Sequence, residues 1–352
     1  MMTLLFPYRG REVSRVKRSL DSLLLQSNKD FQVAFIDYGT PSEKAAQVKE
    51  LVTSYAFASY QYSYHIDTMW NKSRALNILI KELKTSHCFV ADIDMIFHPD
   101  FIRTLHELKT VDHVVYFQVG FLSEEETQQE KSFEDYTIKF KSAPGATGLS
   151  MFPVKALQEV RGFDEYYHLW GSEDTDIHDR LKHKGLSVYF YDKQLLMLHQ
   201  YHKIYRNLED SYITKNITIK DIARKNYTYR LERNEAKATV ANLENHWGAI
   251  QTKETYDLLL KPESITEVPL QKKQFTHWLS ELHTHPKTGI HRYDLKGDNH
   301  WLGNFKASIL GKYTLKSASD SLLWFHINHF RYKRYLYTIS ADCKTIRYTI
   351  WL

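Results

Sequence analysis

The chain has 352 residues and a formal net charge of +5, and its hydrophobic fraction of 43% is ordinary for a globular protein. Its length allows about two domains of ~150 residues each. The charge is far below the clustered excess typical of nucleic-acid-binding proteins, and no apolar run approaches the ~18 residues that a membrane span needs, so we expect a soluble protein without a nucleic-acid partner.

Strands and helices are predicted to alternate over the first hundred or so residues. Short apolar runs predict strands at 3–6, 31–36, 60–64 and 87–91. Apolar residues at helical spacing predict helices at 12–26, 42–55, 70–83 and 101–108. This alternation is typical of parallel strands joined by crossover helices, so the predicted fold class is α/β.

The pattern changes after this region. A strand is predicted at 111–119, and the polar, then Pro/Gly-rich segment 123–145 predicts a surface loop, with a mobile lid as the sharper alternative. Further elements are predicted up to residue 198: helices at 154–160 and from the acidic stretch to about 185, and strands at 188–191 and 195–198. From there we expect a charged, mostly helical stretch at 207–247, a connector at 253–273, and strands at 332–339 and 346–352. We therefore divide the chain into an α/β unit at 1–205 and a smaller helical plus β region at 206–352.

An acidic stretch, Trp170-Gly171-Ser172-Glu173-Asp174-Thr175-Asp176, precedes one of the predicted helices. It combines an aromatic ring, a glycine that permits close backbone approach, and three carboxylates. Burying such acid density without a cation is costly. A solvated first helical turn is the alternative, but the other motifs favour a wall of a binding site.

Two more acidic side chains, Asp92 and Asp94, follow the predicted strand at 87–91. Open α/β sheets bind ligands at this end of their strands, and on a regular strand the two side chains would point the same way. Paired carboxylates suit Mg²⁺ or Mn²⁺ on a diphosphate, and His199, after a later strand, shifts the preference toward Mn²⁺. Taken singly, each motif has a structural alternative, such as a turn acid.

These residue types suit transfer of a sugar from a nucleotide diphosphate. The metal would neutralise the leaving diphosphate, and Asp174 or Glu173 would take the proton from the attacking hydroxyl. Phosphate or uracil oxygens could pair with three basic residues, for which solvated surface charge is the alternative: Arg9, Arg11 and Lys72.

An ordered set of motifs carries a family resemblance. The set comprises Phe6–Arg11, Trp70–Asn77, Asp92–Asp94, Gly148–Ser150, Gly162–Asp164, Trp170–Asp176 and the histidine after the last strand. Over residues 3–205 the chain resembles an inverting, metal-dependent GT-A glycosyltransferase of the family-2 type, above all the β1,4-galactosyltransferases and bacterial chondroitin-polymerase-type domains. The resemblance implies a GT-A, Rossmann-like mixed sheet flanked by helices.

The resemblance also implies donor-binding positions. Uridine-side contacts are implied for Pro7, Arg9, Asp37 and Trp70, and Arg11 closes the same loop motif. Donor-sugar, ribose or diphosphate contacts are implied for Lys72, Asp92, Gly148, Trp170 and Gly171. Lysine at position 72 replaces the arginine of the galactosyltransferases, which keeps the charge but loses the planar fork.

For the metal, the resemblance implies Asp94 and His199 as ligands, with His202 as the alternative histidine. It implies Asp174 as catalytic base and Glu173 as a donor-sugar contact. Inversion by a single displacement is favoured because the related retaining enzymes lack the aspartate at the Asp174 position. The chain departs from the galactosyltransferases in having Ser172 in place of a second glycine and Leu196 in place of a methionine ligand.

We therefore expect a UDP-sugar-dependent glycosyltransferase that uses Mn²⁺ or Mg²⁺. It would move a hexose or N-acetylhexosamine, of the Gal or GalNAc type, to a saccharide or lipid-linked saccharide in bacterial surface polysaccharide or glycan synthesis. A non-catalytic GT-A-like protein that binds nucleotide-sugar or glycan is the alternative. A nucleotidyltransferase is a third class of function, and the acidic stretch does not favour it.

The expected location is cytoplasmic, because Cys88 and Cys343 lie far apart without metal-binding spacing and are predicted to be reduced. Peripheral contact with the inner face of the membrane stays open. The basic and aromatic run at 329–335 could contact an anionic lipid headgroup or the acceptor glycan, and an exposed sheet edge kept soluble by charge is the alternative.

Overall fold

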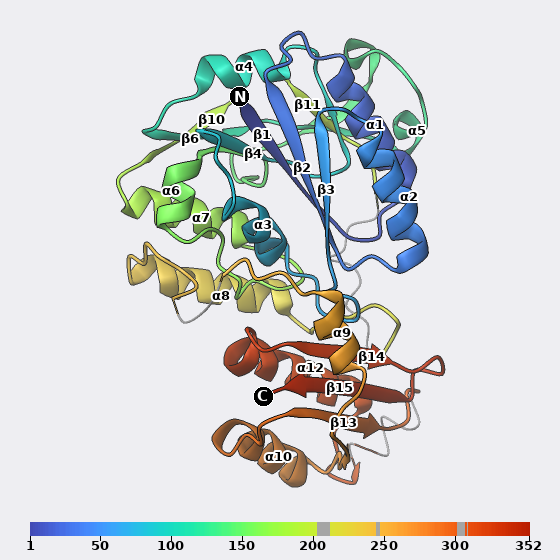
Figure 1. Cartoon of the computed structure of the whole chain (residues 1–352). Helices are drawn as coiled ribbons and strands as arrows, with labels where there is room; N and C mark the ends of the chain where they lie inside the picture. Colours follow the sequence, from blue (N-terminus) through green and yellow to red (C-terminus); the bar gives the residue numbers. More distant parts are fainter. Residues whose placement is uncertain (203–211, 244–246, 301–306, 308) are drawn as a thin grey trace.

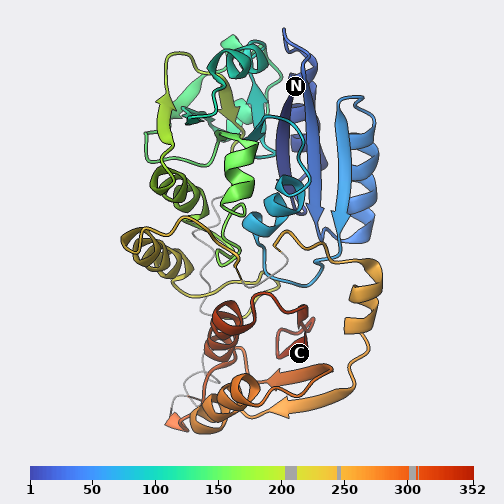
Figure 2. The ribbon, with the colours of Figure 1, turned by 60° about the vertical axis from the view of Figure 1, so that its left-hand side comes forward.

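A computed structural model of the chain describes all residues except 203–211, 244–246, 301–306 and 308 (Figure 1). The described residues form a large N-terminal α/β body and a smaller C-terminal body built on its own sheet. Two helices lie between the sheets of the two bodies, α8 (Ile222–Glu235) and α9 (Lys253–Leu259) (Figures 1 and 2). The predicted boundary at 205/206 lies outside the described residues.

A seven-stranded sheet in the order β10-β6-β9-β4-β1-β2-β3 runs through the large body. Its strands are β1 (Met2–Tyr8), β2 (Phe31–Tyr38), β3 (Ala58–Ser63), β4 (His87–Val90), β6 (His113–Phe117), β9 (Ser150–Pro153) and β10 (Ser187–Tyr191). Only β9 is antiparallel to its neighbours in this sheet. The carboxyl ends of β1, β2 and β4 therefore meet at one edge, where several predicted site residues lie.

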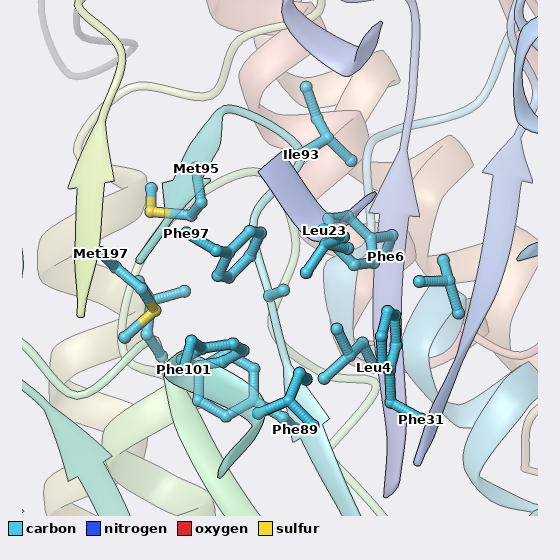
Figure 3. Packing of buried hydrophobic residues seen from close by; sticks show 14 of the residues in the cluster. Leu4, Phe6, Leu23, Phe31, Phe89, Ile93, Met95, Phe97, Phe101 and Met197 are labelled. Atoms are coloured by element: carbon cyan, nitrogen blue, oxygen red, sulfur yellow. The ribbon is translucent and has the colours of Figure 1, made fainter. Parts of the chain in front are cut away.

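Helices cover both faces of the large sheet. One face packs against α1 (Val13–Leu24), α2 (Ser42–Thr53) and α4 (Phe101–Leu108). The other packs against α3 (Lys72–Ile80), α6 (Val154–Glu159) and α7 (Glu173–His183). Strand β1 is apolar at successive positions 4–6 because Leu4 and Phe6 enter the first core, shown in Figure 3, while Leu5 enters the second. The apolar side chains Val16, Leu20 and Leu23 of α1 recur every three or four residues and face the first core.

The predicted mixed α/β sheet flanked by helices is confirmed. The strands and helices predicted up to residue 108 are all present, with ends within three residues of the predicted ones. Helix α4 has the predicted bounds, Phe101–Leu108. The apolar pattern was sufficient here because each helix buries one apolar stripe, and the central strands are short apolar runs buried on both faces.

A second sheet, in the order β5-β11-β7-β8, lies beside the large one. Its strands are β5 (Met95–Phe97), β7 (Gly120–Leu122), β8 (Ile138–Lys141) and β11 (Met197–His199). The prediction of an unstructured surface loop at 123–145 is wrong, because this segment contains α5 (Glu124–Thr127), the 3₁₀ turn Phe133–Asp135 and β8. Few apolar residues mark the segment, but Tyr136 packs against Leu122 and Leu198 in a small core.

The C-terminal body is a four-stranded sheet in the order β12-β13-β15-β14, with two helices packed on one face and Leu259 of α9 packed against Leu336 on the other. Its elements are β12 (Ser264–Val268), α10 (Lys272–Thr284), β13 (Ile290–Lys296), α12 (Leu315–Phe325), the π-helical turn His326–Phe330, β14 (Tyr335–Ile339) and β15 (Thr345–Trp351). The connector predicted at 253–273 is wrong, since it includes α9 and β12. Its prolines, Pro262 and Pro269, stand just outside these elements rather than marking a linker.

The two bodies are joined by direct hydrogen bonds as well as by shared core. The Tyr335 hydroxyl accepts a 2.8 Å hydrogen bond from the Met69 amide. The Tyr337 amide donates to the Asp67 carbonyl at 2.6 Å. Because residues 67–69 precede α3, the C-terminal sheet helps to hold the segment that leads into the predicted donor site.

Candidate metal centre and active site

Three potential metal ligands meet beyond the end of β4. His202 Nε2 lies 3.2 Å from Asp94 Oδ2, and His199 Nε2 lies 3.7 Å from Asp94 Oδ1. One ligand atom from each residue lies within 4.8 Å of the others. The structure thus brings together Asp94 and both candidate histidines. One carboxylate and two imidazoles form a donor set suited to a divalent transition metal.

The backbone explains this convergence. Strand β4 ends at Val90 and β5 begins at Met95, so Asp94 lies in a short turn between them. Strand β11 pairs antiparallel with β5, with His199 opposite Met95, and the Gln200 amide donates to the Asp94 carbonyl at 3.0 Å. The core side chain of Ile93 anchors the turn (Figure 3). Strand pairing therefore places the histidines beside the aspartate.

Electrostatics keeps these ligands ready to bind a cation. Burial alone raises the pKa of Asp94, but its hydrogen bond with His202 and the positive charges around it outweigh burial and lower the pKa to about 2. Burial lowers the pKa of His199 despite the opposing Asp94 charge. An ionised carboxylate and a neutral imidazole are the forms that coordinate metals. Arg11 contributes to both effects, so its charge lies near the metal centre.

Asp92 has a different partner from Asp94. Its Oδ1 accepts a 2.7 Å hydrogen bond from Lys72 Nζ, and its side chain is 38% exposed. The two carboxylates were expected to point the same way only on a regular strand, and this condition is not met, because β4 ends at Val90 and a turn follows at 93–94. Burial acts to lower the pKa of Lys72, but the charges of Asp92, Glu173 and Asp174 raise it overall. Lys72 is therefore a fully charged ammonium beside the acidic stretch.

The acidic stretch enters helix α7 through an unusual backbone turn. Leu169, Gly171 and Ser172 have φ angles of 63°, 106° and 73°, in the region that L-residues other than glycine seldom adopt. Such backbone strain is commonly found at functional sites. The turn ends at Ser172, and helix α7 begins with Glu173 and Asp174.

The three carboxylates of this stretch have separate surroundings. Asp176 is buried, accepts a 2.7 Å hydrogen bond from Arg180 Nε and a 3.1 Å hydrogen bond from the Tyr167 hydroxyl, and so belongs to the interior. Burial and the neighbouring Asp174 charge raise the pKa of Glu173 to about 7, although Lys72 opposes them. Glu173 and Asp174 are thus the two carboxylates of this stretch that could take part in a reaction.

Gly148 lies directly against Asp174. A Cβ atom at position 148 would stand 3.5 Å from Asp174 Oδ2, and the neighbouring hydroxyls of Thr147 and Thr175 are 3.1 Å apart. The segment before β9 therefore packs on the first turn of α7. A glycine here leaves the space beside the carboxylate open.

The charge of Asp92 acts on both the metal cluster and the acidic stretch. Its charge raises the pKa of His199 on one side and the pKa of Glu173 on the other. The metal cluster and the acidic stretch therefore lie around one region rather than at unconnected places.

The predicted uridine-side residues lie at the ends of β1 and β2 and, for Trp70, just before α3. Pro7 is in β1, and Arg9, just beyond it, donates hydrogen bonds to the carbonyls of Tyr38, His65 and Thr68 and to the Thr68 hydroxyl. The Arg9 guanidinium also lies 5.8 Å from the centre of the Trp70 ring. Arg9 thus shapes this wall of the region through protein contacts.

Asp37 is fully buried at the end of β2. Its Oδ1 accepts from the Thr40 amide at 2.9 Å and its Oδ2 from the Tyr60 hydroxyl at 2.8 Å. Burial raises its pKa although both hydrogen bonds oppose the change. In this structure Asp37 holds the loop after β2, and a uracil contact remains a prediction.

Trp170 is 37% exposed, and its backbone is held from behind by a residue that the sequence did not indicate. The Asn226 side chain of α8 donates to the Trp170 carbonyl at 2.9 Å and to the His168 carbonyl at 3.2 Å. A Cβ atom at Gly171 would lie 3.8 Å from Ala223 Cα, so α8 packs closely under the turn. An asparagine in a charged helix carries no sequence signal of this role.

Comparison with known protein families found a match over part of the chain. A family model described as the N-terminal domain of galactosyltransferase matches residues 127–207, less than half of the chain but including the acidic stretch and both histidines. This match is consistent with the predicted resemblance to a GT-A glycosyltransferase. No curated protein sequence matches the chain.

Several solved structures are similar to the chain at low sequence identity. The mannosyltransferase PcManGT from Pyrobaculum calidifontis, in complex with GDP-Man and Mn²⁺, has 12% identity and a TM-score of 0.43 over 67% of this chain and 63% of its own. GalNAc-T7 with UDP, GalNAc and Mn²⁺ has 13% identity and a TM-score of 0.47 over 66% and 48%. TarS from S. aureus has 10% identity and a TM-score of 0.47 over 80% and 48%. The chain thus spans between 48% and 63% of the length of these proteins.

No helix in the described part of the chain is both long and apolar enough to span a bilayer.

Proposed function

We propose that the protein is an inverting, metal-dependent glycosyltransferase that moves a sugar from a UDP-sugar to a saccharide hydroxyl. One observation carries the proposal: the cluster of Asp94, His199 and His202 and the pair Glu173–Asp174 lie around one region, with Asp92 between them. The match to a galactosyltransferase family across the acidic stretch and the histidines supports it.

The donor set fits Mn²⁺, because two imidazoles and one carboxylate suit it better than Mg²⁺, which prefers oxygen ligands. When bound, the ion supplies positive charge to the leaving diphosphate. Arg11 adds a fixed positive charge near the same end of the site. Lys72, paired with Asp92, can bind a phosphate or sugar oxygen. We propose that Pro7, Arg9, Asp37 and Trp70 form the uridine end.

We assign the catalytic base to Asp174, which would take the proton of the attacking hydroxyl. Glu173, whose pKa is raised to about 7, can hold a proton and donate a hydrogen bond to a sugar oxygen. Trp170 and Gly171 would form the sugar wall, since an indole ring offers a flat apolar face. Gly148 leaves open space beside the base.

The donor type, Gal or GalNAc, follows the galactosyltransferase resemblance, as does a saccharide or lipid-linked saccharide acceptor in bacterial polysaccharide or glycan synthesis. The free thiols of Cys88 and Cys343 suit a cytoplasmic location. Peripheral membrane contact would follow from a lipid-linked acceptor.

A donor screen tests the proposal. The full chain is incubated with UDP-Gal, UDP-GalNAc, UDP-Glc, UDP-GlcNAc or GDP-Man, with Mn²⁺ or with a chelator, and nucleotide release is measured. We expect release from one UDP-sugar that requires Mn²⁺ and falls by about 10²-fold or more in Asp174→Asn. Binding of a UDP-sugar without release would instead favour a non-catalytic binding protein, and release from GDP-Man alone would overturn the UDP assignment.

A further inference from the structure

A separate cavity of about 220 Å³ lies where the two bodies meet. Its walls come from the loop before α3 (His65 and Thr68), from residues 249–251, and from residues 332–335 at the start of β14. Arg74 and Glu165 complete the lining. The candidate metal ligands, Lys72 and the acidic stretch do not take part in this lining. The cavity adjoins the proposed uridine end through Arg9, which donates hydrogen bonds to His65 and Thr68 in the cavity wall.

The charge of this cavity is positive. Glu165 is the one carboxylate among the lining residues that the structure describes. It accepts hydrogen bonds from Arg74 Nε at 2.7 Å, from Asn77 at 3.1 Å and from the Gly248 amide at 2.7 Å. Its charge is thus compensated within the protein. Arg74 is held in turn by Glu165 and by the Arg331 carbonyl.

Two further cations, Lys333 and Arg334, have exposed side chains and lack an acidic partner within the described part of the chain. Arg334 donates to the neutral hydroxyl of Thr255. Since one carboxylate faces three cationic side chains, the lining has a formal excess of two positive charges. Such an excess, in a hollow walled by protein, attracts anions more strongly than the same charges on an open surface.

Neutral polar groups in the walls can complete a binding site. His65 is 5% exposed, and its Nδ1 lies 2.8 Å from the Ser63 hydroxyl, while its Nε2 has no hydrogen-bond partner among the described residues. Gln251 is 3% exposed and donates to the Tyr64 carbonyl at 2.8 Å, and its side-chain oxygen likewise has no partner in the described ranges. Neither atom belongs to the buried polar atoms that lack a partner, so each is accessible to water or to a molecule in the cavity.

We propose that this cavity binds a small anion, a phosphate or carboxylate carried by a molecule of about one sugar ring, through Lys333 and Arg334. The size agrees, because the volume falls below the range of ~300–1,000 Å³ typical for drug-sized ligands. The proposal goes beyond sugar transfer and does not depend on it. The walls come from both bodies, so an occupant stabilises the junction and raises the melting temperature.

Isothermal titration calorimetry on the full chain, with a chelator present, tests the proposal. The probes are inorganic phosphate, glucose 6-phosphate, glucuronate and uncharged glucose. We expect binding of at least one anion, weakening as salt rises, and no binding of glucose. Binding of both phosphate compounds without glucuronate identifies a phosphoryl ligand, and binding of glucuronate identifies a carboxylate. Glucose binding as tight as the anions, or no binding of any anion, overturns the proposal.

Three sets of variants locate the binding. The exposed double change Lys333→Gln with Arg334→Gln should weaken anion binding at least about tenfold, because hydrogen bonds to charged groups are lost. Ala249→Phe keeps every charge but fills the cavity, and should weaken binding as well. The matched control Lys272→Gln with Lys273→Gln removes the same charge from α10 and should change nothing. Equal anion binding in all variants would contradict the proposal.

A change in the candidate metal centre separates this proposal from the proposed transfer. Asp94→Asn should leave anion binding in the chelated protein unchanged while abolishing metal-dependent UDP release. Loss of anion binding in Asp94→Asn would place the anion at the metal centre and overturn the second site.

Discussion

His202 Nε2 lies 3.2 Å from Asp94 Oδ2, although the two residues come from separate segments of the chain. His199 approaches the other oxygen of the same carboxylate. A buried acid flanked by two imidazoles is uncommon as a purely structural arrangement, because each group must give up hydration. The arrangement leads to specific expectations for metal binding, catalysis, pH dependence and the support of Trp170.

Removal of either histidine should weaken Mn²⁺ binding. We expect His199→Ala and His202→Ala each to lower the affinity by about tenfold or more, and Asp94→Asn to lower it further, because each change removes a ligand. Titration of Mn²⁺ followed by electron paramagnetic resonance measures the free ion directly. His106→Ala, which removes an imidazole beside Asp30, is the matched control. An unchanged affinity in His202→Ala would show that His202 is not a ligand.

Asp174 and Asp176 should respond in opposite ways to substitution by asparagine. Asp174→Asn is expected to abolish most transfer with little loss of stability, because this carboxylate has no ion-pair partner among the described residues. Asp176→Asn leaves the buried Arg180 guanidinium without its anion and should cost about 3 kcal/mol or more in the free energy of unfolding. Urea denaturation and UDP release distinguish the two. Equal destabilisation by both changes would contradict the assignment of Asp174 to the site.

Glu173 should make stability depend on pH in a defined direction. Burial and Asp174 raise its pKa to about 7, above the ordinary value of 4.5, so the folded protein holds this proton more tightly than the unfolded chain. Ionising Glu173 lowers the free energy of unfolding, and this loss is absent below about pH 4.5. The loss grows as the pH rises through 7 and reaches its full size above that pH. Glu173→Gln should therefore be more stable than the parent at pH 8 and equally stable at pH 4.5.

The measurement is urea unfolding of the metal-free protein at both pH values. Glu43→Gln, at an exposed position in the first turn of α2, serves as control and should show no such dependence. A gain in stability that is the same at both pH values would rule out titration of Glu173 as the cause. The same variant should lose transfer activity if Glu173 contacts the donor sugar.

Asn226 should support activity from behind the Trp170 turn. Asn226→Asp keeps the shape but replaces the amide that donates to the Trp170 and His168 carbonyls with an acceptor. We expect a fall in kcat of about tenfold, with donor affinity less affected, because the strained turn of residues 169–172 loses its support. Ser317→Ala in α12 is a distant control. Full activity of Asn226→Asp would contradict the role.

Local patterns in the sequence were enough for much of the large body. The strands up to β4 and their helices follow from the apolar pattern, because the helices bury one apolar stripe and the central strands are short apolar runs buried on both faces. The candidate metal ligands were also indicated in advance, since Asp94 and His199 stand at the ends of predicted strands. Small elements such as β5 and β12 escaped prediction, because they are short and only one residue in β12 is buried.

Residue types and their spacing along the chain were by themselves enough to determine the α/β class. They also indicated that the acidic stretch and the histidines are candidates for one site. Only the tertiary structure decided which of these side chains meet. It paired Asp92 with Lys72 and Asp176 with Arg180, and it placed both His199 and His202 beside Asp94. The physical reason is that partners distant in sequence are chosen by strand pairing and turn geometry, here β11 against β5, and no local pattern encodes that pairing.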